Sequence, residues 1–171
     1  MKTSTHTRRA RLLGIVLGVA LAGAALAAWR VPGGESTLGA DVRVDAVQTG
    51  EIGVTPLRPF VSAASLLPGA HAGGNVALRN QTGVPLQVRV RALPSTPDLD
   101  SVLQVRIENG SQPLFTGPLS ELRRAGSAAV SLAPGASRKL NVRVSLPAGL
   151  QSGYQGRIVD VTLQIDSASA R

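Results

Sequence analysis

Histidine carries much of the acid–base and metal chemistry that proteins perform near neutral pH, and this chain of 171 residues contains only two histidines. His6 lies in the basic N-terminal segment, which leaves His71 alone in the rest of the chain. A Ser-His-Asp triad would have to be built around His71, and a tetrahedral zinc shell would lack the further histidines and cysteines that it needs. We therefore predict no catalytic residue and no metal ligand, and we interpret His71 as an exposed loop residue.

Two carboxylates placed close together can act as a glycosidase pair or bind calcium. Asp98 and Asp100 have the closest such spacing, in a segment that is rich in proline. We expect them to cap or solvate a turn, with a calcium site as the alternative. The glycines follow neither the P-loop nor the dinucleotide-binding spacing, and Gly73-Gly74 is interpreted as a flexible point. The sequence thus predicts no cofactor.

The net charge of +8 would suit a nucleic-acid-binding protein if the charge were concentrated on one surface. Four of these charges lie within residues 1–11, which leaves +4 for the rest of the chain. The remaining basic residues are scattered singly, apart from Arg123-Arg124 and Arg138-Lys139, as is typical of solvated surface charge. With two Phe, one Trp and one Tyr, the chain also lacks the aromatic side chains on which bases stack. We expect no nucleic-acid partner.

The N-terminal residues have the order of an export signal. A basic start precedes the apolar run Leu12 to Ala28, and Ala25 and Ala27 form the small-x-small pattern that signal peptidase accepts. We therefore predict a signal peptide over residues 1–27, cleavage after Ala27 and a secreted or cell-surface location. Signal peptidase is the first predicted partner, and the protein meets the membrane only through this segment.

Two alternatives to a conventional cleaved signal remain open. The apolar run reaches the lower end of the length that spans a bilayer, so the segment could be retained as an anchor. Arg8-Arg9 also resembles a twin-arginine signal, although Arg11 stands where that motif normally has an apolar residue. The chain has no cysteine, which excludes a lipoprotein anchor, disulfides and thiol chemistry.

The rest of the chain shows the alternation of apolar and polar residues that is typical of strands with one buried face. A leader of residues 28–40, which contains Pro32 and several glycines, shows no such pattern, and we place the start of the domain at Asp41. The domain then covers residues 41–171. The apolar positions with period two are Val42 and Val44; Val76 and Leu78; Leu86, Val88 and Val90; Leu103, Val105 and Ile107; Leu140, Val142, Val144 and Leu146; and Val159, Val161, Leu163 and Ile165.

Turn signals separate these strands. Asn109-Gly110 predicts a hairpin, and Pro118 to Arg124, followed by Gly126, has the end residues of a short helix. Many short strands with one polar face predict an all-β fold, an antiparallel β-sandwich of jelly-roll or immunoglobulin-like type.

Several short motifs together resemble the TasA and camelysin (CalY) family of exported bacterial surface and biofilm-matrix proteins. The resemblance covers roughly Thr49 to Ile165. Its motifs follow a signal with an arginine-rich start, and they are Gly50–Val54, Leu67-Pro68-Gly69, Val76–Val88, Leu132-Ala133-Pro134-Gly135, the strand Leu140 to Leu146 with Pro147, and Tyr154-Gln155-Gly156.

This resemblance implies a jelly-roll-like sandwich and a structural role as a fibre subunit. In TasA-like fibres the segment after the cleavage site is thought to add as a strand to the next subunit, which here corresponds to about Ala28 to Val44. The residues of this segment that we expect to take part in assembly are Trp29, Val31, Leu38, Val42 and Val44. The camelysin branch is associated with metalloprotease activity, but the sequence offers no ligand set for it.

We therefore expect a secreted, non-enzymatic structural protein of the bacterial cell surface or biofilm matrix, which assembles with itself or with other surface proteins. The alternative is a monomeric secreted binding or accessory module for a protein or glycan partner. The third hypothesis is an enzyme, whose activity would have to depend on His71.

Overall fold

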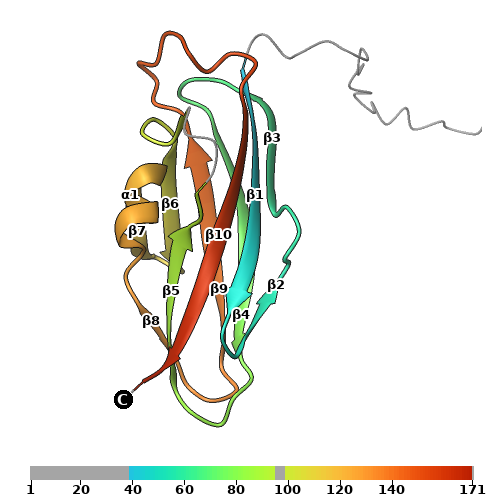
Figure 1. Cartoon of the computed structure of the whole chain (residues 1–171), viewed down its shortest axis with the longest axis vertical. Helices are drawn as coiled ribbons and strands as arrows, with labels where there is room; N and C mark the ends of the chain where they lie inside the picture. Colours follow the sequence, from blue (N-terminus) through green and yellow to red (C-terminus); the bar gives the residue numbers. More distant parts are fainter. Residues whose placement is uncertain (1–38, 95–98, 171) are drawn as a thin grey trace, which may run out of the picture. The chain divides into compact units, whose positions relative to one another are not determined.

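Two sheets of five strands pack face to face to form the domain (Figure 1). The computed structural model describes residues 39–94 and 99–170, which lie within one compact unit, Gly33–Arg171. The first sheet has the order β3 (Val61–Leu66), β1 (Ala40–Thr49), β10 (Ile158–Ser169), β5 (Leu86–Ala92), β8 (Val130–Leu132). The second has the order β2 (Ile52–Thr55), β4 (His71–Asn80), β9 (Ser137–Ser145), β6 (Gln104–Asn109), β7 (Gln112–Pro118).

The alternation in the sequence is what places the core between these sheets. In β5, for example, Leu86, Val88 and Val90 are buried while the residues between them are exposed. Burial of one such aliphatic side chain stabilises the fold by about 1.5–3 kcal/mol. The predicted all-β sandwich is therefore confirmed. Its largest fully buried side chains are aliphatic, among them Ile52, Leu78, Leu103, Ile107, Leu122, Leu132, Leu140, Leu146, Leu163 and Ile165.

The strand directions differ from the prediction at one pair. All neighbours run antiparallel except β1 and β10, which are parallel, with Val42 opposite Val159 and Val44 opposite Val161. Alternation reveals that one face of a strand is buried, but it does not reveal the direction of the neighbouring strand. The first and last strands of the described domain thus lie side by side inside the first sheet.

The helix α1 (Leu119–Ala125) connects β7 to β8 and lies beside the two sheets, as Figure 1 shows. Pro118 precedes it with extended backbone, and Gly126 ends it with a φ of 73°, where its N–H donates to the carbonyl of Leu122. Leu119 and Leu122 are buried. The predicted helix is confirmed, and so is the predicted hairpin, in which Gly110 has a φ of 62° between β6 and β7.

The prediction of flexibility at Gly73-Gly74 is wrong. Both glycines lie inside β4 and pair with β9. A Cβ on Gly74 would collide with the backbone carbonyl of Phe60, close to the point where the chain crosses between the sheets. Glycine is needed here because the backbones approach closely, not because the chain bends.

The first described strand, β1, begins at Ala40, next to the predicted domain start at Asp41. The predicted signal peptide, with Ala25 and Ala27, lies outside the described residues. Within the part of the chain that is described, no helix is long and apolar enough to cross a membrane.

Candidate functional site

Only part of the predicted assembly segment lies within the described residues. Trp29, Val31 and Leu38 lie outside the described residues. Val42 and Val44, in contrast, are fully buried in β1, which is paired with β10 on one side and β3 on the other. Their inclusion in a segment given to a neighbouring subunit is wrong, because releasing them would remove a central strand of their own core.

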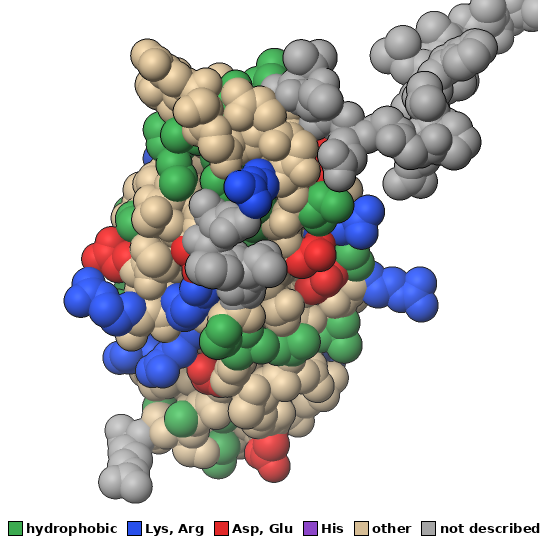
Figure 2. Space-filling view, turned by 45° about the horizontal axis from the view of Figure 1, so that its top comes forward, with side chains coloured by type: hydrophobic (Ala, Val, Ile, Leu, Met, Phe, Trp, Pro, Cys, Tyr) green, Lys and Arg blue, Asp and Glu red, His purple; other side chains and the backbone are tan. Residues whose placement is uncertain are grey.

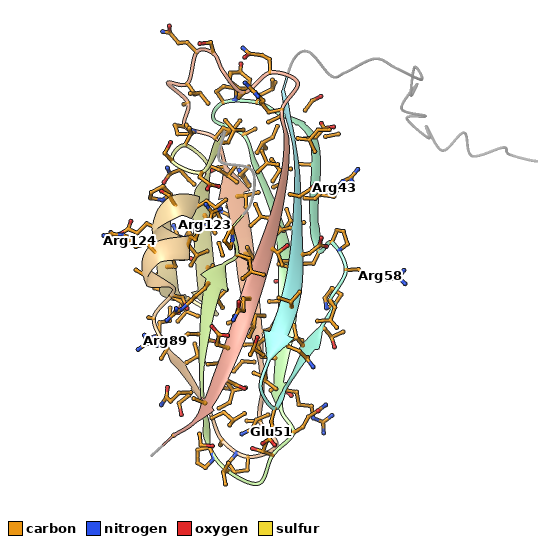
Figure 3. All side chains as sticks on the ribbon, viewed as in Figure 1. Arg43, Glu51, Arg58, Arg89, Arg123 and Arg124 are labelled. Atoms are coloured by element: carbon orange, nitrogen blue, oxygen red, sulfur yellow. The ribbon has the colours of Figure 1, made fainter. Side chains whose placement is uncertain are left out.

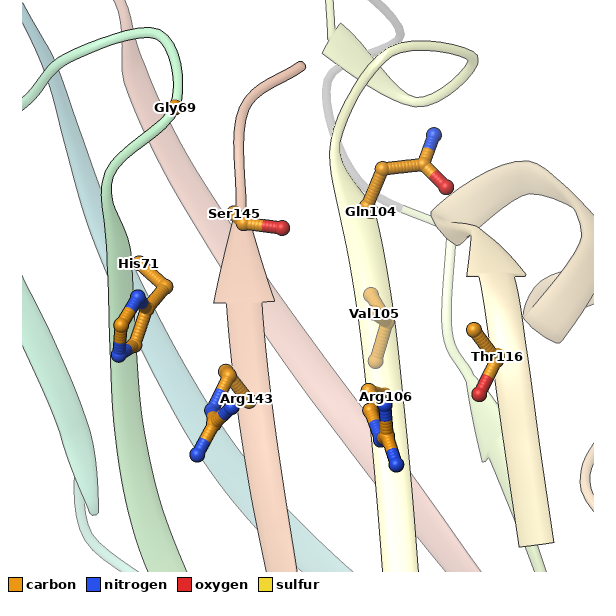
Figure 4. A pocket seen from close by; sticks show the side chains of 8 residues that line it. All are labelled: Gly69, His71, Gln104, Val105, Arg106, Thr116, Arg143 and Ser145. Atoms are coloured by element: carbon orange, nitrogen blue, oxygen red, sulfur yellow. The ribbon is translucent and has the colours of Figure 1, made fainter. Parts of the chain in front are cut away.

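His71 was expected in a loop, but it is the first residue of β4. The strand begins earlier than the apolar alternation indicates, because its first half contains small and polar residues. His71 is exposed and lines a shallow depression of about 300 Å³ on the outer face of the second sheet (Figure 4).

Four neighbouring strands supply the polar side chains of this depression. The register places His71 opposite Ser145 and Ser145 opposite Gln104. One row further along the sheet, Arg143 lies opposite Arg106, which lies opposite Thr116 on β7. Figure 4 shows the guanidinium groups of Arg106 and Arg143 on adjacent strands, with Thr116 level with Arg106 and the Ser145 and Gln104 side chains in the row above. These two arginines, with Gln104, Thr116 and Ser145, form the Arg106–Arg143 site.

The two arginines have different partners. Arg106 forms an ion pair with Glu108 on its own strand, at 2.6 Å from Nη2 to Oε1, and its side chain is 51% exposed. Arg143 forms no ion pair within residues 39–94 and 99–170. The site therefore holds one cation that is partly neutralised and one that is not.

The outer face of the first sheet is arranged differently. Its register places Arg43 opposite Asp160 and Arg89 opposite Asp166, so opposite charges occupy facing positions. Acidic and basic side chains are accordingly interspersed on the face seen in Figure 2. A facing pair of like charges distinguishes the second sheet.

Asp100 was predicted to cap or solvate a turn and Arg123 to be a solvated surface charge; the structure shows instead that they pair with each other. Asp100 is 7% exposed, and both of its carboxylate oxygens accept from Arg123 of α1. Figure 3 shows Arg123 turned toward the sandwich and its neighbour Arg124 extended away from it. This pair attaches the helix to the segment before β6, and Asp98 lies outside the described residues.

The chemistry that this surface offers is binding. Among the described residues, no group of three or more His, Cys, Asp or Glu side chains is placed to hold a metal ion. The depression instead presents guanidinium, hydroxyl and amide groups, which together suit an anionic ligand. Sequence analysis missed Arg106 and Arg143, although the alternation already placed both on the polar face of predicted strands.

Replacing His71 by alanine is expected to change the free energy of unfolding by no more than about 0.5 kcal/mol, because the side chain is exposed at the end of a strand. Urea denaturation followed by circular dichroism checks this. A clear loss of stability would mean that His71 has a structural role that its exposure does not indicate.

Comparison with known proteins assigns no family. No known family model matches the sequence, and no curated protein matches it. Among solved structures, the chain is similar to the ASH / PapD-like domain of human CEP192 (PapD-like domain 7), with 12% sequence identity and a TM-score of 0.28. The match covers 81% of this chain and 90% of that one. A similarity at this level carries no inference about what the chain does.

Proposed function

We propose that the chain is an exported, non-enzymatic structural protein of the bacterial cell surface or biofilm matrix, and that its subunits assemble by strand addition. The order of basic, apolar and small residues before Trp29 supports export. The resemblance to the TasA and camelysin family supports a structural role.

The observation that carries the proposal is the place where the fold begins. Both sheets are built from residues 40–169, and β1 is already held between β10 and β3. Most of the leader, residues 28–38, lies outside the described residues, and the described strands pair with one another into both sheets. After cleavage at Ala27, this leader would be the N-terminal arm of the mature protein, available to a neighbouring subunit.

The acceptor in this proposal is the outer edge of β3. Exposed edges invite pairing with another strand unless proline, charge, short length or a β-bulge protects them. The register of β3 with β1 shifts between Ala63 and Leu66, where Ser65 has a φ of 55°, so the regular part of this edge is Val61–Ala63. β3 has six residues, none of which is proline or charged, and Ser62 and Ala64 are exposed on it.

The other strands that stand last in their sheets, β2, β8 and β7, are better protected. β2 and β8 have four and three residues. β7 has Pro113 and Pro118, which cannot donate a backbone hydrogen bond, and the carbonyl of Leu114 already accepts from Ala128.

The energetics require several contacts at once. Each backbone hydrogen bond contributes about 0.5–1.5 kcal/mol net, so four or more must form together with burial of apolar side chains such as Val31 and Leu38. Because the arm of one subunit meets the edge of the next, the contact is head-to-tail and need not close on itself. Filaments are therefore expected rather than dimers.

Deleting residues 28–38 behind the intact signal is expected to abolish polymerisation while leaving a folded, secreted monomer, since residues from Gly39 onward form the sheets. Electron microscopy and sedimentation of the exported protein measure this. Ala64→Lys on β3 should have the same effect, because a charge on the edge opposes strand pairing.

Ser131→Lys is the matched control, since Ser131 is an exposed position on β8, the other edge of the same sheet. It should polymerise like the wild type. Polymers of the deletion variant, or a wild-type protein that stays monomeric at all concentrations, would contradict strand addition.

A second candidate function, a monomeric binding module, is favoured by the Arg106–Arg143 site. A monomeric binding module would use this surface to bind a ligand and would not need to assemble. A wild-type protein that remains monomeric but retains a ligand at that site would support this alternative.

A further inference from the structure

The Arg106–Arg143 site departs from the charge arrangement of the rest of the molecule. On the first sheet, the register places an aspartate opposite Arg43 and another opposite Arg89. On the second sheet, the register places Arg143 directly opposite Arg106. Residues that face each other across two strands have Cα atoms about 4.5–5.5 Å apart, and like charges in such positions destabilise a sheet.

This repulsion is only partly relieved inside the protein. Glu108 lies on the same strand as Arg106 and partly neutralises it, and the Glu108 side chain is 19% exposed. On the other side of Arg143, the facing residue of β4 is Gly73, which provides no side chain. A ligand with negative charge would stabilise the pair, and Gly73 leaves room for it.

We propose that the Arg106–Arg143 site binds a phosphate-type oxyanion. A tetrahedral anion with several oxygens can accept from two guanidinium groups at once, each of which presents a planar fork of donors. Ser145, Thr116 and Gln104 add hydroxyl and amide groups from three strands. Within the protein, the Thr116 hydroxyl donates to the carbonyl of Phe115 and Gln104 Nε2 donates to that of Val102, so an anion would compete for these two groups, whereas the two guanidinium groups carry the binding. The depression of about 300 Å³ is large enough for a phosphate and part of the molecule that carries it.

The surface continues along β4 and β9 in the direction away from His71. Outward positions on these strands carry Arg79 and Lys139, and no acidic residue occurs in either strand. The outward residues of β4 between His71 and Arg79 are Gly73, Asn75 and Ala77, none of which is charged. The same chemistry therefore fits two sources, a free phosphate at the arginine pair or the phosphate groups of a polymer lying along this strip.

The test is calorimetric titration of the full chain, kept soluble with a non-ionic detergent, at low ionic strength, where surface charges are least screened. The probes are inorganic phosphate and polyphosphate. Arg143→Gln is expected to weaken binding of whichever probe binds by about tenfold or more. Without ligand, its thermal midpoint should not fall, because the substitution removes a repulsion.

Arg89→Gln is the matched control, since it removes the same charge from an exposed outward position that faces Asp166. It should bind like the wild type. If the binding of inorganic phosphate depends on Arg143, the ligand is a small one. If only the binding of polyphosphate depends on Arg143, the ligand is a polymer. Both results support the site.

Three results would overturn the proposal. They are the absence of binding of both probes at millimolar concentration, equal weakening by Arg143→Gln and Arg89→Gln, and Arg143-dependent binding of a carboxylate polysaccharide with no binding of phosphate. None of them bears on strand addition, because the site and β3 lie on different sheets.

Discussion

Replacing Asn80 by alanine is expected to lower the free energy of unfolding by about 3 kcal/mol, because it removes a fully buried amide whose donors and acceptor are all in use. Nδ2 donates to the carbonyls of Val84, Leu132 and Ala133 at 2.8, 3.1 and 3.1 Å. Oδ1 accepts from the backbone N–H and the hydroxyl of Thr82 at 2.9 and 2.7 Å.

The large effect follows from what alanine would leave behind. A typical hydrogen bond contributes about 1 kcal/mol net, but a buried polar group without a partner costs about 1–3 kcal/mol. The carbonyls of Leu132 and Ala133 belong to the end of β8 and the loop after it, whereas Asn80 ends β4. One side chain thus connects the two sheets at the turn between β4 and β5.

Urea denaturation of the full chain measures the loss, with Asn141→Ala as the control. Asn141 is an exposed position on β9, so its substitution should change the free energy of unfolding by less than about 0.5 kcal/mol. Asn80→Asp should be at least as harmful at neutral pH, because it replaces a donor with an acceptor that faces three carbonyls. Equal stabilities of Asn80→Ala and Asn141→Ala would contradict this role.

The turn at Asn80 shows what sequence reasoning reaches and what it misses. Asn80-Gln81-Thr82-Gly83 is recognisable as a turn because asparagine and threonine bond to nearby backbone. The contacts with Leu132 and Ala133 span 52 and 53 residues, and no local pattern predicts them. The same limit explains why the parallel pairing of β1 with β10 was not predicted from the sequence.

The Arg106–Arg143 site also depends on contacts between strands that a local pattern does not predict. Each arginine stands at a polar position of a strand that alternation predicts, at β6 and β9. That they face each other depends on strand order and register, which a periodic pattern leaves undetermined. His71 is the one histidine outside the N-terminal segment, but the charges that suit an anionic ligand belong to its neighbours in the depression, Arg106 and Arg143.

Asp100 provides the second large effect, since Asp100→Ala is expected to lower the free energy of unfolding by about 3 kcal/mol. The side chains of Asp100 and Arg123 are 9% and 25% exposed. Removing one partner of a buried ion pair costs about 3–5 kcal/mol, and the partial exposure of Arg123 places the expected loss at the lower end of that range. Arg123 also donates through Nε to the carbonyl of Leu93 at 3.3 Å, which holds the guanidinium in place.

The neighbouring pair on the same helix is a matched control. Arg124 and Glu121 lie 4.0 Å apart, with side chains that are 82% and 47% exposed. Exposed pairs of this kind contribute about 0–1 kcal/mol, so Glu121→Ala should hardly change the urea midpoint. Asp100→Asn, which keeps an oxygen acceptor for Arg123, should lose less stability than Asp100→Ala.

The order of these three variants separates a buried pair from surface charge. Full chains carrying Glu121→Ala, Asp100→Asn and Asp100→Ala should show increasing losses in urea denaturation. Hydrogen exchange should show the same order in α1, because the Ser120 N–H donates to the Asp100 carbonyl at 2.9 Å and the ion pair holds that contact. If Asp100→Ala and Glu121→Ala unfold at the same urea concentration, the pair does not anchor the helix, and the buried Leu119 and Leu122 must hold it alone.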